Sequence, residues 1–368
     1  MSKTRFLMIG GFLGAGKTTA IARLAQHYTD AGLRVGIVTN DQAFGLVDTH
    51  ALRAQGFDVS EVPGACFCCK FNELVETAAL LGVRHQPDII LTEPVGSCTD
   101  LVATVLQPLK YLFGDRYSLG PLAVLCKPDH GRKILGGGTG GFSPQAAYIF
   151  AKQLEEADVV VLNKIDRLSV TEQHELRALL TKRFPKKQIL ATSGVTGAGY
   201  ADLIAALATD PVPKDQPLEI DYETYAAGEA ALGWLNASAQ FTSTANNWSL
   251  DALVVELASN FCELLSAADM EPGHVKVLAS ADGATAVANW VATEAPVELS
   301  VAAKTDVFAA NVLVNGRVHG NPDELAELAR QSIATVARRL KLDCRLADWQ
   351  HFRPGAPKPV HRYTTPAG

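Results

Sequence analysis

Three short segments of this chain combine residue types that bind phosphate, guanine and a soft metal ion. Residues 11–18 read GFLGAGKT, which fits the phosphate-loop pattern G-x-x-x-x-G-K-[ST]. Residues 163–166 read NKID, a pattern typical of guanine recognition, and residues 66–69 read CFCC. Together the three patterns predict a protein that couples GTP hydrolysis to the handling of a metal.

The phosphate loop lies between a predicted strand and a predicted helix. Residues 5–9 are a short apolar run, and residues 19–25 have helical spacing without a breaker. Glycines let backbone N–H groups face the phosphates, and the helix N-terminus adds a favourable dipole. This order of elements argues against an ordinary glycine-rich turn. We expect nucleotide contacts from Gly11, Gly14, Ala15, Gly16, Lys17, Thr18 and Thr19, with Lys17 on the β- and γ-phosphates and the Thr18 hydroxyl on Mg²⁺.

The second segment predicts a preference for guanine. Residues 158–162 form an apolar run, and Asn163, Lys164 and Asp166 follow at its carboxyl end, where α/β sheets bind ligands. The Asp166 carboxylate can accept hydrogen bonds from N1–H and the amine of guanine, and adenine lacks this donor pair. Ser193, which follows another apolar run, can add backbone contacts to the base. We therefore expect GTP to bind better than ATP.

The cysteine segment can place three thiols around one ion. Cys66, Cys68 and Cys69 lie on one short loop, and thiolates favour Zn²⁺, Cu(I) or iron–sulfur chemistry. A tetrahedral site needs a fourth ligand, and the candidates are Asp41, Asp48, Cys98 or water. Two alternatives stay open at this stage: reduced structural cysteines near a core, and a redox switch.

An acidic residue also follows the apolar run at residues 88–92. Glu93 can reach Mg²⁺ or its water shell there, and Gly96 lets the backbone approach the γ-phosphate. Phosphoryl transfer depends mainly on positioning and charge neutralisation. Because no residue is an obvious water-positioning Gln or Arg finger, we expect slow, Mg²⁺-dependent turnover.

Along the chain the phosphate loop, the cysteine segment, Glu93-Pro94-Val95-Gly96 and the guanine segment follow one another in the order of a known family. The chain resembles the CobW-like branch of the metal-centre P-loop GTPases, relatives of the urease and hydrogenase nickel-insertion GTPases. The resemblance covers about residues 4–210 well and the remainder loosely. In the family's acidic segment Asp41 takes the place of the first Glu, so the implied catalytic set is Lys17, Thr18, Asp41 and Glu93.

The resemblance implies a GTPase that binds a transition metal through its C-x-C-C loop and delivers the metal, or a metal cofactor, to a client metalloprotein or cofactor enzyme. The implied cofactors are GTP or GDP, Mg²⁺ and a transition metal, with Zn²⁺ as the first choice and Co²⁺ or Ni²⁺ as alternatives. A chaperone for a cobalamin or corrinoid enzyme is a close variant. The alternative from another class is a non-catalytic metal or redox sensor.

Composition limits the partners and the compartment. Of 368 residues, 33 are Lys or Arg and 39 are Asp or Glu, a net charge of −6 that disfavours nucleic acid as a partner. Seven cysteines, partly clustered, indicate a reducing compartment. No apolar run is long enough to span a bilayer and no signal peptide fits before the first strand, so we expect a cytoplasmic protein without membrane contacts. A homodimer stays open.

Hydrophobic patterning predicts two domains. Strand-like and helix-like runs alternate to about residue 207, which predicts an α/β P-loop GTPase domain with a mainly parallel sheet over residues 1–209. A polar, proline-rich linker is expected over 210–229, a smaller α+β domain over 230–342, and an extended proline-containing tail over 343–368. Within the tail, residues 361–363 can dock on the GTPase domain or stay loose. Predicted segments include strands at 188–191, 235–242, 275–280 and 284–291 and helices at 144–157, 171–184, 251–267 and 322–340.

Overall fold

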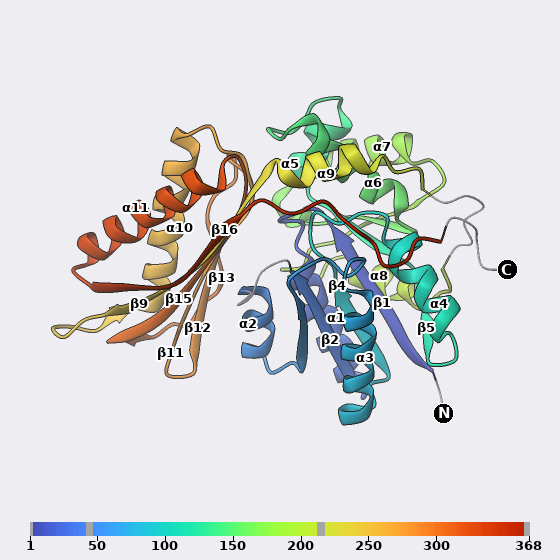
Figure 1. Ribbon diagram of the computed structural model, residues 1–368, viewed down its shortest axis with the longest axis horizontal. Coiled ribbons are helices and arrows are strands. Elements are labelled where there is room, and N and C mark those ends of the chain that lie inside the picture. The colour runs from blue at the N-terminus through green and yellow to red at the C-terminus, as the bar shows by residue number, and fades with distance from the viewer. Residues whose placement is uncertain (1–2, 42–46, 212–217, 364–368) are drawn as a thin grey trace.

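A computed structural model describes residues 3–41, 47–211 and 218–363, without the side chains of Asp41, Arg84 and His85. Parts of three predicted segments, at residues 42–46, 212–217 and 364–368, lie outside this description. The chain forms two sheets side by side, with helices around the N-terminal sheet and an antiparallel sheet at the other end of the molecule (Figure 1).

The N-terminal sheet is parallel and buried. In the described part of the chain it has eight strands in the order β3-β2-β4-β1-β6-β7-β8, with β5 beside β1. The strands are β1 (Thr4–Gly11), β2 (Val35–Asp41), β3 (Val59–Pro63), β4 (Ile89–Glu93), β5 (Tyr117–Leu119), β6 (Ala123–Cys126), β7 (Val159–Leu162) and β8 (Gln188–Ala191). Every residue of β4, β6 and β7 is buried, as expected for central strands covered on both faces.

Helices cover both faces of this sheet and form two apolar cores, one on each face. They are α1 (Lys17–Asp30), α2 (Val47–Ala54), α3 (Phe71–His85), α4 (Gln107–Phe113), α5 (Pro128–Leu135), α6 (Pro144–Glu156), α7 (Val170–Arg183) and α8 (Tyr200–Leu207), with the short helices η1 (Val102–Leu106) and η2 (Ile165–Arg167). Local signals start several of them: Ser143 caps α6, and Ser169 with Glu172 forms a capping box at α7. The predicted α/β fold class is confirmed.

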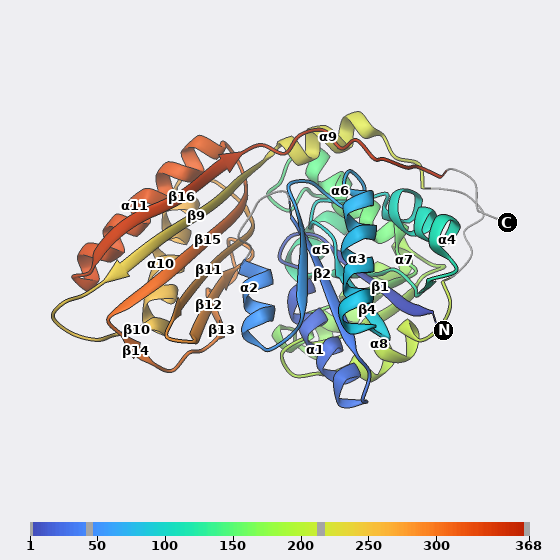
Figure 2. The same cartoon turned by 60° about the horizontal axis from the view of Figure 1, so that its bottom comes forward.

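The C-terminal sheet is antiparallel. Among the described residues its six strands are ordered β13-β12-β11-β15-β9-β16, and β10 pairs separately with β14. The strands are β9 (Leu232–Thr242), β10 (Trp248–Ser249), β11 (Pro272–Ala281), β12 (Ala284–Trp290), β13 (Glu298–Val301), β14 (Asp306–Val307), β15 (Ala309–His319) and β16 (Asp343–Phe352). Helices α10 (Leu250–Ala267) and α11 (Pro322–Leu340) pack on one face of this sheet (Figure 2).

The opposite face of the C-terminal sheet meets the N-terminal domain. Leu278 of β11 and Val287 of β12 pack against Val47 of α2. Alternation along β11 places Val275 and Val277 in the core under the helices and the intervening residues on the face toward the N-terminal domain. The two domains therefore share an interface formed by a face of the C-terminal sheet and helix α2 with the nearby loop at Gly14.

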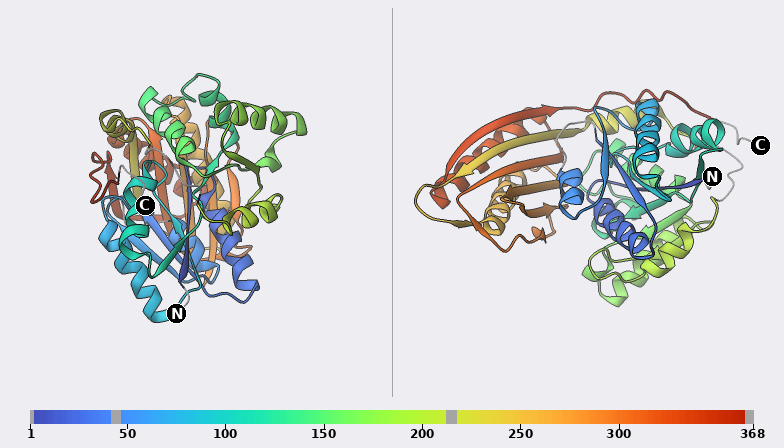
Figure 3. Two further views of the ribbon diagram at one scale, coloured as in Figure 1. Left: turned by 90° about the vertical axis from the view of Figure 1, so that its right-hand side faces the viewer. Right: turned by 90° about the horizontal axis from the view of Figure 1, so that it is seen from below.

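Two predicted boundaries were wrong. The expected linker contains helix α9 (Tyr222–Ala230), which Asp221 caps and which buries Tyr225 and Glu229 against the first domain. The expected tail begins with β16, which pairs with β9 over most of its length. From residue 353 the chain leaves the sheet and runs along the N-terminal domain (Figures 1 and 3). In the part that the structure describes, no helix is long and apolar enough to cross a membrane.

Candidate nucleotide site and thiol cluster

The phosphate loop joins β1 to α1 and is tied to the guanine-recognition segment. Asn163 Nδ2 donates to the carbonyl oxygen of Ala15 at 2.9 Å. Gly16 has φ 93°, and a Cβ there would lie 2.6 Å from Asn163 Nδ2, so glycine is required at this position. Gly11 serves a different contact, because a Cβ there would lie 2.7 Å from the Leu125 carbonyl oxygen of β6. A hydrogen bond thus joins the phosphate loop to the segment at residues 163–166, about 150 residues later in the sequence.

A cavity of about 670 Å³ collects most of the predicted nucleotide residues between the two domains. Those that line it are Gly14, Gly16, Lys17, Thr18, Thr19, Glu93, Gly96, Asn163, Lys164 and Asp166. Burial lowers the pKa of Lys164 to about 7, and the exposed Asp166 lies at the edge of the cavity. The N–H of Ser193 donates within its own turn to Ala198, and Gly194 and Val195 line the cavity there.

Oxygen ligands gather at the phosphate end of this cavity. The Thr18 hydroxyl lies 2.5 Å from Asp48 Oδ1 and 3.1 Å from Glu93 Oε1, and Lys17 Nζ lies 3.9 Å from Glu93 Oε1. Glu93 Oε2 is buried and has no hydrogen-bond partner among the described residues. Hydroxyl and carboxylate oxygens are the ligands that Mg²⁺ prefers, so this orphaned oxygen beside Thr18 fits the predicted magnesium site.

Burial and charge shift the pKa values at this end of the cavity. Burial, with the neighbouring charge of Asp48, raises the pKa of Glu93 to about 7. Burial also lowers the pKa of Lys17. Burial alone would raise the pKa of Asp48, but the charge and hydrogen bond of Lys276 hold it below its ordinary value. Such a set of buried charges is typical of a site that binds a charged ligand.

The C-terminal domain contributes groups to the cavity that the sequence analysis missed. Lys276 of β11 forms an ion pair with Asp48. Val291, which also lines the cavity, is bound from the N-terminal domain, because Lys127 Nζ donates to the carbonyl oxygens of Gly273 and Val291 at 3.1 and 2.6 Å. Lys276 stands between Val275 and Val277 on the opposite face of the strand, so alternation could have marked it as a polar position. Its partner could not be read from sequence, because it lies 228 residues away.

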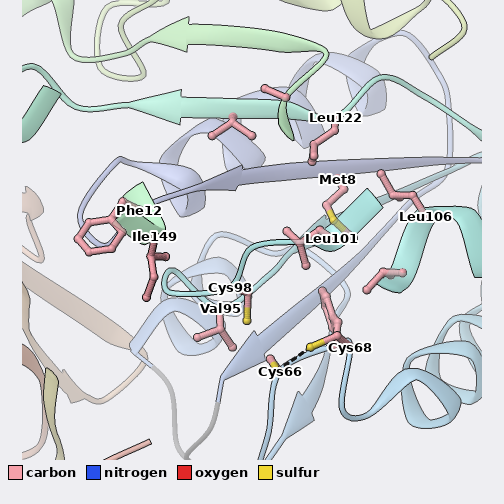
Figure 4. Close-up of a cluster of buried hydrophobic side chains, with 14 of the residues drawn as sticks. Met8, Phe12, Cys66, Cys68, Val95, Cys98, Leu101, Leu106, Leu122 and Ile149 are labelled. Carbon is pink, nitrogen blue, oxygen red and sulfur yellow. Dashed lines mark hydrogen bonds between the residues drawn. The ribbon is translucent and has the colours of Figure 1, made fainter. Parts of the chain in front are cut away.

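The three predicted thiols converge. The Sγ atoms of Cys66 and Cys68 are 3.0 Å apart, those of Cys66 and Cys69 are 3.3 Å apart, and those of Cys68 and Cys69 are 3.8 Å apart (Figure 4 draws the first pair). The three Sγ atoms all lie within 4.8 Å of one another. Among the described residues, these three cysteines are the His, Cys, Asp or Glu side chains that lie close enough together to hold a metal ion. Ligands at about 2.3 Å from a tetrahedral zinc lie about 3.8 Å apart, so only small shifts are needed.

Asn40 connects the thiol loop to the nucleotide cavity. At the end of β2, its Nδ2 donates to the carbonyl oxygens of Val62 and Ala65, each at 2.7 Å, and its Oδ1 accepts from Phe67 N–H at 2.8 Å. The same side chain belongs to the lining of the nucleotide cavity. The buried residue that fixes the cysteine loop therefore also lines the nucleotide cavity.

The thiols have unequal proton affinities. Hydrogen bonds from Cys68, Cys69 and Cys98 hold the pKa of Cys66 well below its ordinary value. The hydrogen bond to Cys66 raises the pKa of Cys69 to about 11. One thiolate stabilised by neighbouring thiols is a good starting point for binding a soft metal, because the thiolate is the metal-binding form.

Residues 358–363 of the tail cover this cluster. Lys358 N–H donates to Cys69 Sγ at 3.2 Å, and Val360 N–H donates to the Cys68 carbonyl oxygen at 2.9 Å. Arg362 Nε lies 2.7 Å from Oδ2 of the buried Asp100, and the His361 ring packs on Phe71. Of the two expectations for this segment, docking on the GTPase domain is confirmed.

The side chains considered as a fourth metal ligand lie in different parts of the structure. Asp48 is engaged by Thr18 and Lys276 in the nucleotide cavity, and the side chain of Asp41 lies outside the described residues. Cys98 is buried beside Cys66. All seven cysteines are free thiols.

A family model and two curated relatives place the chain in the same family. The family described as CobW/HypB/UreG, nucleotide-binding domain, matches residues 5–191. The chain is 30% identical over 182 residues to the zinc chaperone YeiR of Escherichia coli K12, covering 47% of this chain and 50% of YeiR. It is 27% identical over 212 residues to the zinc chaperone CobW of Sinorhizobium sp., covering 49% of this chain and 56% of CobW. The chain thus spans about half the length of these curated relatives.

Solved structures with a similar arrangement include two metal-bound proteins. Nickel-bound HypB from Helicobacter pylori has 20% identity and a TM-score of 0.39, covering 54% of this chain and 83% of HypB. The Zn(II)-bound YjiA GTPase from E. coli has 16% identity and a TM-score of 0.38, covering 91% of this chain and 99% of YjiA.

Proposed function

The chain belongs to the CobW/HypB/UreG family, and from this premise we propose that it is a GTP-hydrolysing metallochaperone with Zn²⁺ as its cargo. The observation that carries the proposal is the convergence of Cys66, Cys68 and Cys69 on a loop that Asn40 ties to the nucleotide cavity. Two curated relatives that match half of the chain are named zinc chaperones. Co²⁺ and Ni²⁺ are the alternative cargoes.

In this proposal the nucleotide chemistry belongs to residues 1–209. Lys17 binds the β- and γ-phosphates, Thr18 and Glu93 hold Mg²⁺, and Asp166 selects guanine. Mg²⁺ bound there neutralises charge on the transferring phosphoryl group. Residues 230–352 close the cavity with Lys276 beside Asp48, which adds a positive charge at the phosphate end. Asp41, at the end of β2, keeps its proposed catalytic role next to Asn40.

The cargo chemistry belongs to the cysteine loop. Three thiolates bind zinc tightly, and a site with a replaceable fourth position can pass the ion on. The proposed client is a metalloprotein or a cofactor enzyme, and the proposed location is the cytoplasm, where free thiols persist.

The test combines zinc stoichiometry with GTP turnover on the full chain. Equilibrium dialysis with elemental analysis should give one zinc per chain, and Cys66→Ala should abolish binding while Cys344→Ala, a half-buried thiol outside the cluster, should leave it intact. Lys17→Ala should abolish hydrolysis and leave zinc binding in place. GTP turnover at the level of a Lys17→Ala blank under every metal tested would favour the non-catalytic sensor instead. Zinc binding that survives Cys66→Ala would remove the proposed cargo site.

A further inference from the structure

A fourth thiol lies beside the cysteine cluster and comes from a different part of the fold. Cys98 is 1% exposed and follows β4 by five residues, on the segment that begins with Glu93 and contains Gly96. Figure 4 shows its sulfur directed toward the pair formed by Cys66 and Cys68. A thiol from the segment after β4 thus points toward the loop after β3, where the Sγ atoms of Cys66, Cys68 and Cys69 lie within 4.8 Å of one another and Cys98 lies just outside that group.

The backbone around Cys98 is fixed by several bonds. Cys98 N–H donates to the Val95 carbonyl oxygen at 3.0 Å, and Gln153 Nε2 donates to the carbonyl oxygens of Gly96 and Cys98 at 3.0 and 2.8 Å. The neighbouring Ser97 hydroxyl donates to the buried Glu229 at 2.6 Å. These bonds hold the segment so that the Cys98 side chain is presented to the cluster.

A buried cysteine is often only a small apolar residue in a core, and Cys126 and Cys262 fit that description. Cys98 differs because it packs in the same buried cluster as Cys66 and Cys68, with its sulfur directed toward them (Figure 4). Among the earlier candidates, Asp48 is committed to the nucleotide cavity. Of the side chains that the structure describes, Cys98 is thus the candidate placed to complete the ligand set.

The segment that carries Cys98 also contacts the phosphate loop. Gly96 packs so closely on it that a Cβ would lie 2.7 Å from Leu13 Cδ2 and 3.1 Å from Lys17 Nζ. Glu93, at the start of the segment, faces Thr18 at 3.1 Å. In the proposed function a γ-phosphate and its cation would lie between these groups, and the position of the segment would then depend on the nucleotide.

We propose that Cys98 is a fourth thiolate ligand for the cargo ion, and that it joins or leaves the ion as residues 93–98 respond to the nucleotide. This inference rests on the proposed metallochaperone function. When Cys98 joins, its thiol proton passes to solvent and its sulfur replaces a water on the ion. The four-sulfur form retains zinc, and the three-sulfur form exposes a position to a client.

The test counts sulfur ligands on zinc-loaded full-length protein by X-ray absorption, with GDP and with a non-hydrolysable GTP analogue. The wild type should show four sulfurs at about 2.3 Å in the tighter-binding state and three in the other. Cys98→Ala should show three in both states and bind zinc at least about tenfold more weakly in the tighter state, while the GTP affinity of the zinc-free protein stays unchanged. Cys262→Ala, which removes a buried thiol from the C-terminal domain, is the matched control.

Three sulfurs in both states of the wild type, or a sulfur count and affinity unchanged in Cys98→Ala, would overturn the role of Cys98 and leave the three-thiol chaperone standing. If Cys98→Ala does not fold, Cys98→Ser also removes the sulfur and should give the same number of sulfur ligands on zinc. Failure of the wild type to bind zinc at all would overturn the proposed function together with this inference.

Discussion

The ion pair between Lys276 and Asp48 gives a quantitative test of how the C-terminal domain closes the nucleotide site. The two side chains are 15% and 21% exposed, and Asp48 also accepts from Thr18. In Lys276→Met the Asp48 carboxylate loses the cation that holds its pKa below the ordinary value. Removing one partner of a fully buried pair costs about 3–5 kcal/mol, so partial exposure here suggests about 2–3 kcal/mol.

A double-mutant cycle isolates this interaction. The free energy of unfolding in urea would be measured for the wild type, Lys276→Met, Asp48→Asn and the double variant, with the exposed Lys182→Met as the matched control. We expect a coupling energy of at least about 1 kcal/mol between the two sites. GTP affinity should also fall by about tenfold in Lys276→Met, because a cation leaves the phosphate end of the cavity.

A coupling energy below about 0.3 kcal/mol, together with unchanged GTP affinity, would refute this reasoning. It would mean that the C-terminal sheet does not cover the nucleotide in solution.

Three further predictions concern the base, the tail and the domain interface. Asp166→Asn should shift the preference from guanine toward xanthine nucleotides, because the amide offers a donor where the carboxylate accepted; nucleotide competition binding checks this, and equal ATP and GTP affinity in the wild type would contradict it. Arg362→Ala should speed alkylation of Cys69 by about tenfold, because the tail over this thiol loses the charge-assisted hydrogen bond of Arg362 to Asp100, which contributes about 1.5–3 kcal/mol. The exposed Arg345→Ala is the control. Equal alkylation rates in Arg362→Ala and the wild type would show that the tail does not shield the thiol. Burial lowers the pKa of His130 from 6.5 to about 4, so its contribution to stability is complete above pH 6.5 and is lost as the pH falls toward 4. This corresponds to about 3 kcal/mol at most, and His130→Gln should flatten the pH dependence of urea unfolding in that window; an identical slope would contradict the shift.

The chemistry of the site could be predicted from the sequence where the residues involved are close together in the chain. The phosphate loop and the cysteine loop each carry their ligands within a few residues, so pattern and chemistry coincide. The start of helix α11 at Pro322 and its end at about residue 340 were predicted correctly, because proline is favoured in the first turn and the apolar spacing is regular. Strand β8 was also predicted to the residue.

The features that sequence did not reveal depend on contacts between distant segments. Helix α9 lacks a strong apolar stripe and is stabilised by packing Tyr225 and Glu229 on the first domain. Strand β16 is largely exposed, and its identity as a strand comes from pairing with β9, about 100 residues earlier. The ion pair of Lys276 with Asp48 and the shielding of Cys69 by the tail arise in the same way.

Coupling between nucleotide and cargo is the central claim, and a zinc titration in two nucleotide states tests it most directly. Allosteric coupling is typically about 1–3 kcal/mol, so zinc affinity should differ by about 5–150-fold between the GDP-bound and GTP-analogue-bound protein. Because coupling is reciprocal, zinc should change the ratio of the two nucleotide affinities by the same factor. Identical zinc affinities in the two states would make the thiol cluster and the GTPase site independent features and would contradict a GTP-driven chaperone.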